Sequence, residues 1–201
     1  MKQIVLASAS PRRKKLLQQI NLPFEVHPSS VEENYNPEWS PGKIVKELSL
    51  KKGKNVATDF SSALVISADT IVTFEDTILE KPEDANEAYD MLTQLSNNTH
   101  QVYTGVALCK TDQINNIAGT KTFFEVTDVT FGKLNPQDIK NYVEGGSPMD
   151  KAGSYGIQDD FGAIFVKRIE GDYNNVVGFP LHSFYNTVRN FAGEFLPNPG
   201  N

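Results

Sequence analysis

The feature that most constrains the fold is the alternation of short apolar runs with amphipathic stretches. Strand-like runs occupy residues 3–7, 24–27, 63–68 and 163–169, and two short runs at 71–74 and 78–79 predict a hairpin. Helices are predicted at 11–19, 41–56, 82–95, 135–142 and 181–191. In the middle, two long strand-like runs, 102–110 and 117–131, are joined by a short polar turn and so predict an antiparallel pair. The pattern predicts an α/β fold with a mixed, largely antiparallel-centred sheet flanked by helices.

Length and composition narrow the class of protein. The 201 residues suit one compact domain over residues 1–195, with two lobes around a cleft and a loose tail at 196–201. The net charge of −6 argues against a nucleic-acid or membrane partner. The single cysteine, Cys109, excludes an internal disulfide and a thiolate metal cage. The first residues turn polar too soon for a signal peptide and no apolar run is long enough to span a bilayer, which predicts a cytoplasmic protein.

A cluster of positive charge near the N-terminus breaks a local rule. Ser10 and Pro11 predict a helix start, yet the first turn holds Arg12, Arg13, Lys14 and Lys15. A helix N-terminus already carries partial positive charge and favours acids. A phosphate chain at this point would meet backbone N–H groups, hydroxyls such as that of Ser8, and guanidinium groups together. The alternative interpretation is a solvated basic face.

Two further segments carry groups suited to catalysis. Asp69 and Thr70 follow the apolar run 63–68, and we expect them at the end of a buried strand, where ligands gather in α/β sheets. A turn aspartate is the alternative interpretation of Asp69. Lys81 precedes Pro82 at a predicted helix start and could project toward the same cleft, or lie on the surface.

A glycine-rich segment at residues 145–158 allows close backbone approach to a ligand. Within it, Tyr155 offers a stacking surface and Gln158 an amide for readout, unless the segment is only a tight connection before a strand. Neither a P-loop nor a Rossmann glycine motif occurs in the chain.

Taken together, these segments resemble the Maf family. The motifs are SASPRR (8–13), Glu33, Lys52, ADT (68–70), Lys81–Pro82, YTGV (103–106), DKAG (150–153), YGIQ (155–158) and GDYNNVVGFP (171–180). They occur in the family's order and the resemblance extends from Ile4 to about Phe191. It implies a Maf and inosine triphosphatase-like fold, and an enzyme that hydrolyses a nucleoside triphosphate to the monophosphate and pyrophosphate.

The resemblance also implies roles for individual residues. Arg13, Lys52 and Lys81 would bind the triphosphate together with Ser8, and Glu33 with Asp69 would hold a divalent cation, either magnesium or, alternatively, manganese or cobalt. Asp69 would act as the catalytic base. Arg12, Thr70 and Gln158 match the positions that distinguish the subgroup acting on dTTP and UTP. Two residues depart from the family's pattern: Glu80 replaces a glycine before Lys81, and Ser147 replaces a glutamate before Pro148.

Other functions stay open on the sequence alone. The same reaction on another base, such as that of 7-methyl-GTP, and a nucleotide-binding regulator of cell division without turnover are the two alternatives. The carboxylates of Asp69 and Glu33 favour the enzyme, because a pure binder has less need of them. The family further implies a homodimer.

Overall fold

The computed structural model describes residues 2–158 and 161–196, and these form two compact units. Unit 1 comprises the described residues of Met1–Asp69, Thr104–Glu125 and Gly178–Asn201, and unit 2 comprises those of Thr70–Tyr103 and Val126–Val177. The single domain over 1–195 and the cleft between two lobes stay predictions. Of the predicted tail, residues 197–201 lie outside the described residues.

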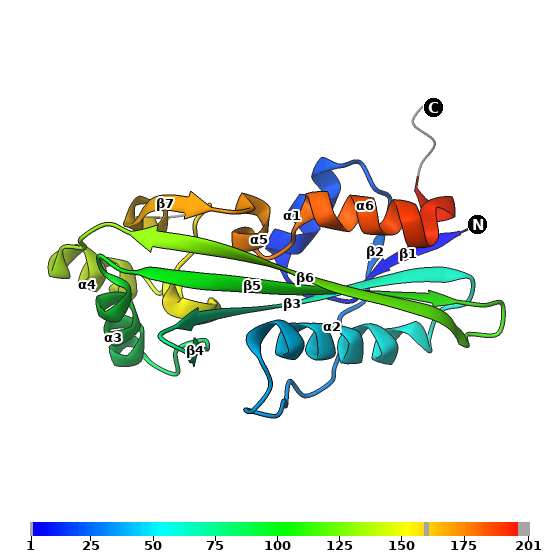
Figure 1. Cartoon of the computed structure of the whole chain (residues 1–201), viewed down its shortest axis with the longest axis horizontal. Coiled ribbons are helices and arrows are strands. Elements are labelled where there is room, and N and C mark those ends of the chain that lie inside the picture. The colour runs from blue at the N-terminus through cyan, green and yellow to red at the C-terminus, as the bar shows by residue number, and fades with distance from the viewer. Residues whose placement is uncertain (1, 159–160, 197–201) are drawn as a thin grey trace. The chain divides into compact units, whose positions relative to one another are not determined.

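Unit 1 is built on parallel strands. Its helices and strands, including the three strands that it shares with unit 2, are β1 (Gln3–Leu6), α1 (Pro11–Gln19), β2 (Glu25–Val26), α2 (Pro41–Ala57), β3 (Ala63–Phe74), β5 (Thr99–Thr111), β6 (Ile117–Phe131), α6 (Leu181–Ala192) and a 3-10 turn at Gly193–Phe195. Strand β1 pairs in parallel with both β2 and β3. Helices α2 and α6 cover opposite faces of these strands (Figure 1).

Helix α2 packs unusually close to the sheet, and a glycine makes this possible. A Cβ added to Gly105 on β5 would lie 2.3 Å from the carbonyl oxygen of Val45 and 2.4 Å from its carbonyl carbon. Both are backbone atoms, so no side-chain rotation would relieve the clash. The predicted motif at 103–106 therefore has a packing role, since Gly105 sets the distance between α2 and β5.

Unit 2 has an aromatic core. Its remaining elements are β4 (Thr77–Leu79), α3 (Ala85–Leu95), α4 (Pro136–Glu144), β7 (Val166–Glu170), α5 (Tyr173–Val177) and three 3-10 turns (Ser147–Asp150, Ala152–Ser154 and Phe161–Phe165). Phe131 packs edge-on against both His100 and Tyr155, and Phe165 packs edge-on against Tyr142.

Local sequence signals explain where the helices begin. The Ser10 side chain accepts a hydrogen bond from the Arg13 N–H at 3.4 Å, and Pro11 opens α1 as predicted. Asn135 caps α4 in the same way and is followed by Pro136. Asp84 caps α3 through the N–H groups of residues 86 and 87. The predicted starts of α1 and α4 are therefore confirmed to within one residue, whereas α3 begins at Ala85 and not at the predicted Pro82.

The strand predictions need three corrections. The runs 63–68 and 71–74 form one strand, β3, so Asp69 lies inside the strand and not at its end, while the predicted hairpin with residues 78 and 79 is confirmed. The polar side chains interrupt the apolar run, but backbone pairing depends only on N–H and C=O groups. The predicted strand at 163–169 begins only at Val166, because residues 161–165 form a 3-10 turn. The predicted strand at 24–27 is reduced to two paired residues, 25 and 26.

The mixed α/β architecture is confirmed. Among the described residues the strand order is β2-β1-β3-β5-β6-β7, with β4 beside β3. Strands β3 and β4, and strands β6 and β7, pair antiparallel, whereas β1 lies between two parallel neighbours. Within the described ranges, every helix is too short or too polar to cross a membrane.

Candidate active site

Asp69 lies where a neighbouring strand ends. The last residue of β1, Leu6, pairs with Ile66, and the N–H of Ala7 donates to the Ile66 carbonyl at 2.7 Å. Beyond this point the chain leaves the sheet toward α1, so β3 runs on past the carboxyl end of β1. Ligands of α/β proteins gather at such strand ends. The prediction that Asp69 ends its own strand is wrong, and its place beside the carboxyl end of β1 is a finding of the structure.

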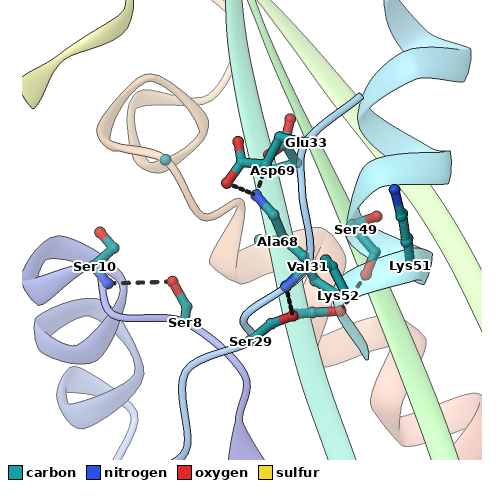
Figure 2. Close-up of polar contacts among 12 residues, drawn as sticks. Ser8, Ser10, Ser29, Val31, Glu33, Ser49, Lys51, Lys52, Ala68 and Asp69 are labelled. Atoms are coloured by element: carbon teal, nitrogen blue, oxygen red, sulfur yellow. Dashed lines mark hydrogen bonds and ion pairs between the residues drawn. The ribbon is translucent and has the colours of Figure 1, made fainter. Parts of the chain in front are cut away.

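The Lys52 side chain connects two carboxylates. Its ammonium lies 2.5 Å from Oδ1 of Asp69 and 2.8 Å from Oε1 of Glu33 (Figure 2). The side chains of Asp69 and Lys52 are 6% and 12% exposed, whereas that of Glu33 is 60% exposed. Two carboxylates thus converge on one cationic position, with one of them buried and the other open to solvent.

Arg13 is held beside this group by neutral oxygen atoms. Its Nη1 donates to the Ala68 carbonyl at 2.8 Å and to Ser8 Oγ at 3.2 Å, and its Nε donates to the Gly178 carbonyl at 2.9 Å. Burial lowers the pKa of the Arg13 guanidinium, while the charge of Asp69 acts in the opposite direction. A guanidinium stays protonated in proteins, so Arg13 brings a fixed positive charge to the residue next to Asp69.

The local fold around the start of α1 explains how Arg13 is aimed. The Ser8 hydroxyl oxygen accepts from the Ser10 N–H at 3.2 Å (Figure 2), and it also accepts from Nη1 of Arg13 at 3.2 Å. Arg12 is half-buried in the same turn, whereas Lys14 and Lys15 are exposed. Arg13 therefore lies at the candidate site and Arg12 is next to it in the chain, whereas Lys14 and Lys15 match the alternative interpretation of a solvated basic face.

The other predicted residues lie in unit 2. Thr70 is half-buried and follows Asp69 directly on β3, Lys81 is exposed before α3, and Gln158 is half-buried. The N–H of Gly153 donates to the carbonyl of Glu80 at 3.2 Å, so the glycine-rich segment is attached to the residue next to Lys81. The structure thus gathers Ser8, Arg12, Arg13, Glu33, Lys52 and Asp69 in unit 1, and Thr70, Lys81 and Gln158 in unit 2.

The glycine-rich segment is a packed turn. Gly153 has a φ of 67° and Ser154 a φ of 62°, so two successive residues adopt the left-handed conformation. Tyr155 is only 6% exposed, and its hydroxyl is hydrogen-bonded to Nε2 of His100 at 2.8 Å. The interpretation of Tyr155 as a stacking surface for a ligand is therefore wrong, because its ring is part of the core of unit 2.

The two departures from the family's pattern both lie in this region. Lys151 donates from its ammonium to the Ser147 carbonyl at 2.5 Å and to the Ser147 hydroxyl at 3.1 Å, and pairs with Asp150 at 2.7 Å. Ser147 thus holds the lysine of the DKAG motif from both its backbone and its side chain. Glu80 contributes its backbone carbonyl to the turn, through the hydrogen bond from Gly153.

Gly178, which contacts Arg13 at the candidate site, was not singled out from the sequence as an individual residue. The Gly178 carbonyl accepts from Nε of Arg13, and Gly178 has a φ of 113°, which only glycine adopts without strain. A backbone carbonyl is present in every residue, so its role as an acceptor cannot be predicted from the residue type. The only available signal was a glycine just before Phe179 and Pro180 at the start of α6.

Comparison with known proteins places this geometry in a family. A model of Maf-like proteins matches residues 3–191. The chain belongs to the Maf family. This Maf protein is 49% identical over 191 residues to the dTTP/UTP pyrophosphatase of Bacillus cytotoxicus, covering 95% of this chain and 96% of that relative. It is 47% identical over 193 residues to the dTTP/UTP pyrophosphatase of Salinibacter ruber, covering 96% and 93%.

A solved structure shares the fold of this Maf protein at low sequence identity. The HAM1 protein from Coxiella burnetii aligns with a TM-score of 0.50 and 15% identity, covering 94% of this chain and 100% of the other. The predicted family and the predicted fold class are both confirmed.

Proposed function

We propose that this Maf protein hydrolyses dTTP and UTP to their monophosphates and pyrophosphate, with Asp69 as the base. The observation that carries the proposal is the arrangement of Asp69, Lys52 and Arg13 at the end of β1. A buried carboxylate there lies beside the ammonium of Lys52, whose side chain is 12% exposed, and a guanidinium donates to the adjacent residue. The relatives named dTTP/UTP pyrophosphatases match nearly the whole chain and support the choice of reaction.

The charges suit a polyphosphate substrate. A nucleoside triphosphate carries close to four negative charges, and its cleavage moves charge onto the leaving pyrophosphate. Arg13 and Lys52 are held by short contacts before a substrate arrives, so little reorganisation is needed when that charge develops. Lys81, on unit 2, is the third proposed phosphate-binding cation.

The site also fits a hard divalent cation. The carboxylates of Glu33 and Asp69 already converge on one cation, the Lys52 ammonium. Among the described residues, no group of three or more His, Cys, Asp or Glu side chains could hold a metal. Magnesium is often held by one or two carboxylates together with substrate phosphates and water, which matches this pair. Bound here, magnesium, or in its place manganese or cobalt, would supply positive charge against the triphosphate.

The chain's own residues account for the proton and the leaving group. A water molecule attacks the α-phosphorus, the bond from that phosphorus to the bridging oxygen breaks, and pyrophosphate leaves. Asp69 accepts the proton of the attacking water, because it is the buried carboxylate of the pair. Lys52 holds the Asp69 carboxylate in place, and Arg13 stabilises phosphate charge.

The preference for a pyrimidine base rests on Arg12, Thr70 and Gln158. A hydroxyl and an amide offer short hydrogen bonds to a base edge, and a buried polar group without its partner penalises the wrong base. Thr70 directly follows the proposed catalytic base on β3, and Gln158 ends the turn that is attached to residue 80.

The proposed surroundings of the enzyme follow from the substrate. Nucleoside triphosphates are cytoplasmic metabolites, so we place the activity in the cytoplasm. The homodimer, and the lack of a nucleic-acid or membrane partner, stay predictions from the sequence.

The test is pyrophosphate release by the purified chain with magnesium, across a panel that includes dTTP, UTP, the purine triphosphates and 7-methyl-GTP. We expect turnover on dTTP and UTP, and a loss of about a thousandfold or more in Asp69→Asn. Asp59→Asn is the matched control, because Asp59 is an exposed aspartate of unit 1 that pairs with His27 at 3.6 Å. Its activity should equal that of the native chain.

The alternative outcomes separate the competing functions. Turnover on 7-methyl-GTP in place of dTTP and UTP keeps the reaction but contradicts the roles of Thr70 and Gln158. Tight nucleotide binding without turnover on any substrate contradicts the enzyme and favours a regulator. Full activity in Asp69→Asn removes Asp69 from the role of base.

A further inference from the structure

A second contact between α2 and β3 runs beside the Lys52–Asp69 pair. Ser67 Oγ donates to the carbonyl of Ser49 at 2.6 Å, and both residues are fully buried. Ser67 precedes Asp69 by two residues on a strand, so the two side chains share one face. Ser49 precedes Lys52 by three residues on a helix, so these two are also neighbours on one face (Figure 2).

The two contacts therefore act as adjacent connections between the same helix and the same strand. The Ser67 hydroxyl joins β3 to the backbone of α2 at 2.6 Å and lies 3.5 Å from the carbonyl of Ala107 on β5. The Lys52–Asp69 contact of 2.5 Å depends on the position of α2 against β3, because the long lysine side chain is carried by α2 and the aspartate by β3.

Gly53 shows that the space around the Ser67 hydroxyl is filled. A Cβ added to Gly53 would lie 2.6 Å from Ser67 Oγ and 3.0 Å from Cys109 Sγ, but 3.6 Å from Ser67 Cβ. The first distance is a severe clash and the last is an ordinary contact. The hydroxyl of Ser67 thus occupies the space that a side chain at position 53 would need. Gly53 is adjacent to Lys52 in the chain.

We propose that Ser67 is a positioning residue that, opposite Gly53, sets the place of Lys52 against Asp69 for the reaction. This inference rests on the proposed function. Ser67 touches neither substrate nor phosphate in this role. It acts through the register of α2, and a misplacement of a catalytic group by about 1 Å can cost a hundredfold in rate.

The test compares four proteins: the native chain, Ser67→Ala, Gly53→Ala and the double variant. Ser67→Ala should lower kcat about fivefold, as expected for one lost hydrogen bond that holds a reacting group. Gly53→Ala should lower kcat by about tenfold or more, because the new Cβ pushes α2 away from Ser67. In both variants KM should change less than kcat, since of the proposed phosphate-binding residues only Lys52 lies on α2, whereas Ser8, Arg13 and Lys81 lie outside it.

The double variant tests whether the Ser67 hydroxyl and the residue at position 53 act on kcat through the same contact. With the hydroxyl removed, the Cβ at position 53 meets Ser67 Cβ at an ordinary distance, and only the Cys109 thiol must give way slightly. Ser67→Ala should therefore lower kcat in the native chain but raise it in the Gly53→Ala background. A structural role alone would change the folded fraction and leave the kcat of the folded protein unaltered. Equal effects of Ser67→Ala in both backgrounds would overturn the proposal.

Two further measurements keep the result unambiguous. Thr58→Ala removes another hydroxyl-to-carbonyl hydrogen bond of the same helix, from Thr58 to Asn55 at 2.9 Å on an exposed turn, and should leave kcat unchanged. If Gly53→Ala does not fold, the kcat of Ser67→Ala alone still decides, and an unchanged value refutes the role.

Crystal structures separate a failure of this inference from a failure of the proposed function. The distance from Lys52 Nζ to Asp69 Oδ1 should lengthen in Gly53→Ala and recover in the double variant. An unchanged distance would refute the positioning role even if the native chain turned over no nucleotide. Absence of turnover in the native chain, with the expected change of distance, would refute only the proposed function.

Discussion

The two units bury ionisable groups in opposite ways. In unit 1, the largely buried side chains of Lys52 and Asp69, 12% and 6% exposed, lie side by side, and their opposite charges compensate each other. In unit 2, His100 and Tyr155 are buried among aromatic rings, and burial lowers the pKa of His100 to about 4 and raises that of Tyr155 far above its usual value. Unit 1 thus keeps charges inside by pairing them, whereas unit 2 keeps its groups neutral.

The two ways of burying ionisable groups suit different roles of the two units. Charged groups that are buried and already paired suit a site where phosphate charge must be met. Neutral aromatic packing suits a unit that holds the turn leading to Gln158 in one conformation, since Tyr155 belongs to both the turn and the core. We therefore expect the chain to lose stability when a buried charge is removed from unit 1, and when a buried charge is added to unit 2.

Removal of a charge from unit 1 should have the largest effect. Lys52→Met leaves the Asp69 carboxylate buried without the ammonium, and breaking a buried pair in this way costs about 3 kcal/mol or more of unfolding free energy. Urea denaturation at neutral pH, with a chelator present, measures this loss. A loss below about 1 kcal/mol would show that the pair is solvated in solution, and the contrast between the units would fail.

Addition of a charge to unit 2 should have an intermediate effect. Because the pKa of His100 is about 4 in the folded chain and 6.5 in its ordinary state, the unfolded chain takes up the proton first as pH falls. The stability is complete above about pH 6.5 and is lost as pH falls toward 4. We expect a loss of about 2 kcal/mol between pH 7 and pH 5, measured by urea denaturation.

Substitution of His100 isolates this contribution. His100→Gln keeps a polar group opposite the Tyr155 hydroxyl but cannot titrate, so its stability should depend far less on pH over the same range. His182→Gln is the matched control, because His182 is exposed on α6, and it should keep the native pH dependence. The same steep dependence in His100→Gln as in the native chain would assign the loss to other groups.

Removal of a charge from the surface should have the smallest effect. Lys110→Met breaks the pair of Lys110 with Glu194 at 3.3 Å, in which the side chains are 31% and 39% exposed. Solvated pairs contribute about 0.2–1 kcal/mol, so the same lysine-to-methionine change should cost several times less here than at position 52. Equal losses at the two positions would mean that burial does not distinguish them.

The sequence predicts those parts of the fold that depend on local signals. The helix starts at Ser10 and Asn135 were predictable because a capping side chain and a proline are adjacent in the chain. The unbroken passage of β3 through Asp69 and Thr70 was not predictable, since backbone pairing does not depend on the polarity of these side chains.

The same distinction applies to the candidate site. Charged residues such as Arg13 and Lys52 could be named from their motifs, and the structure gathers them around the end of β1. The acceptors that orient Arg13 could not be named, because they are the backbone carbonyls of Ala68 and Gly178, and every residue has a backbone carbonyl. The pairing of Ser67 with Ser49 is likewise a tertiary contact without a local signature.

The close approach of α2 to the sheet has a consequence for how this sequence can evolve. Every amino acid other than glycine carries a Cβ, and at position 105 that atom would collide with the backbone of Val45. A substitution elsewhere in α2 could not compensate, because the clash involves no side chain of the helix. In a saturation mutagenesis experiment, position 105 should therefore tolerate as little variation as position 69, although Gly105 has no reactive group.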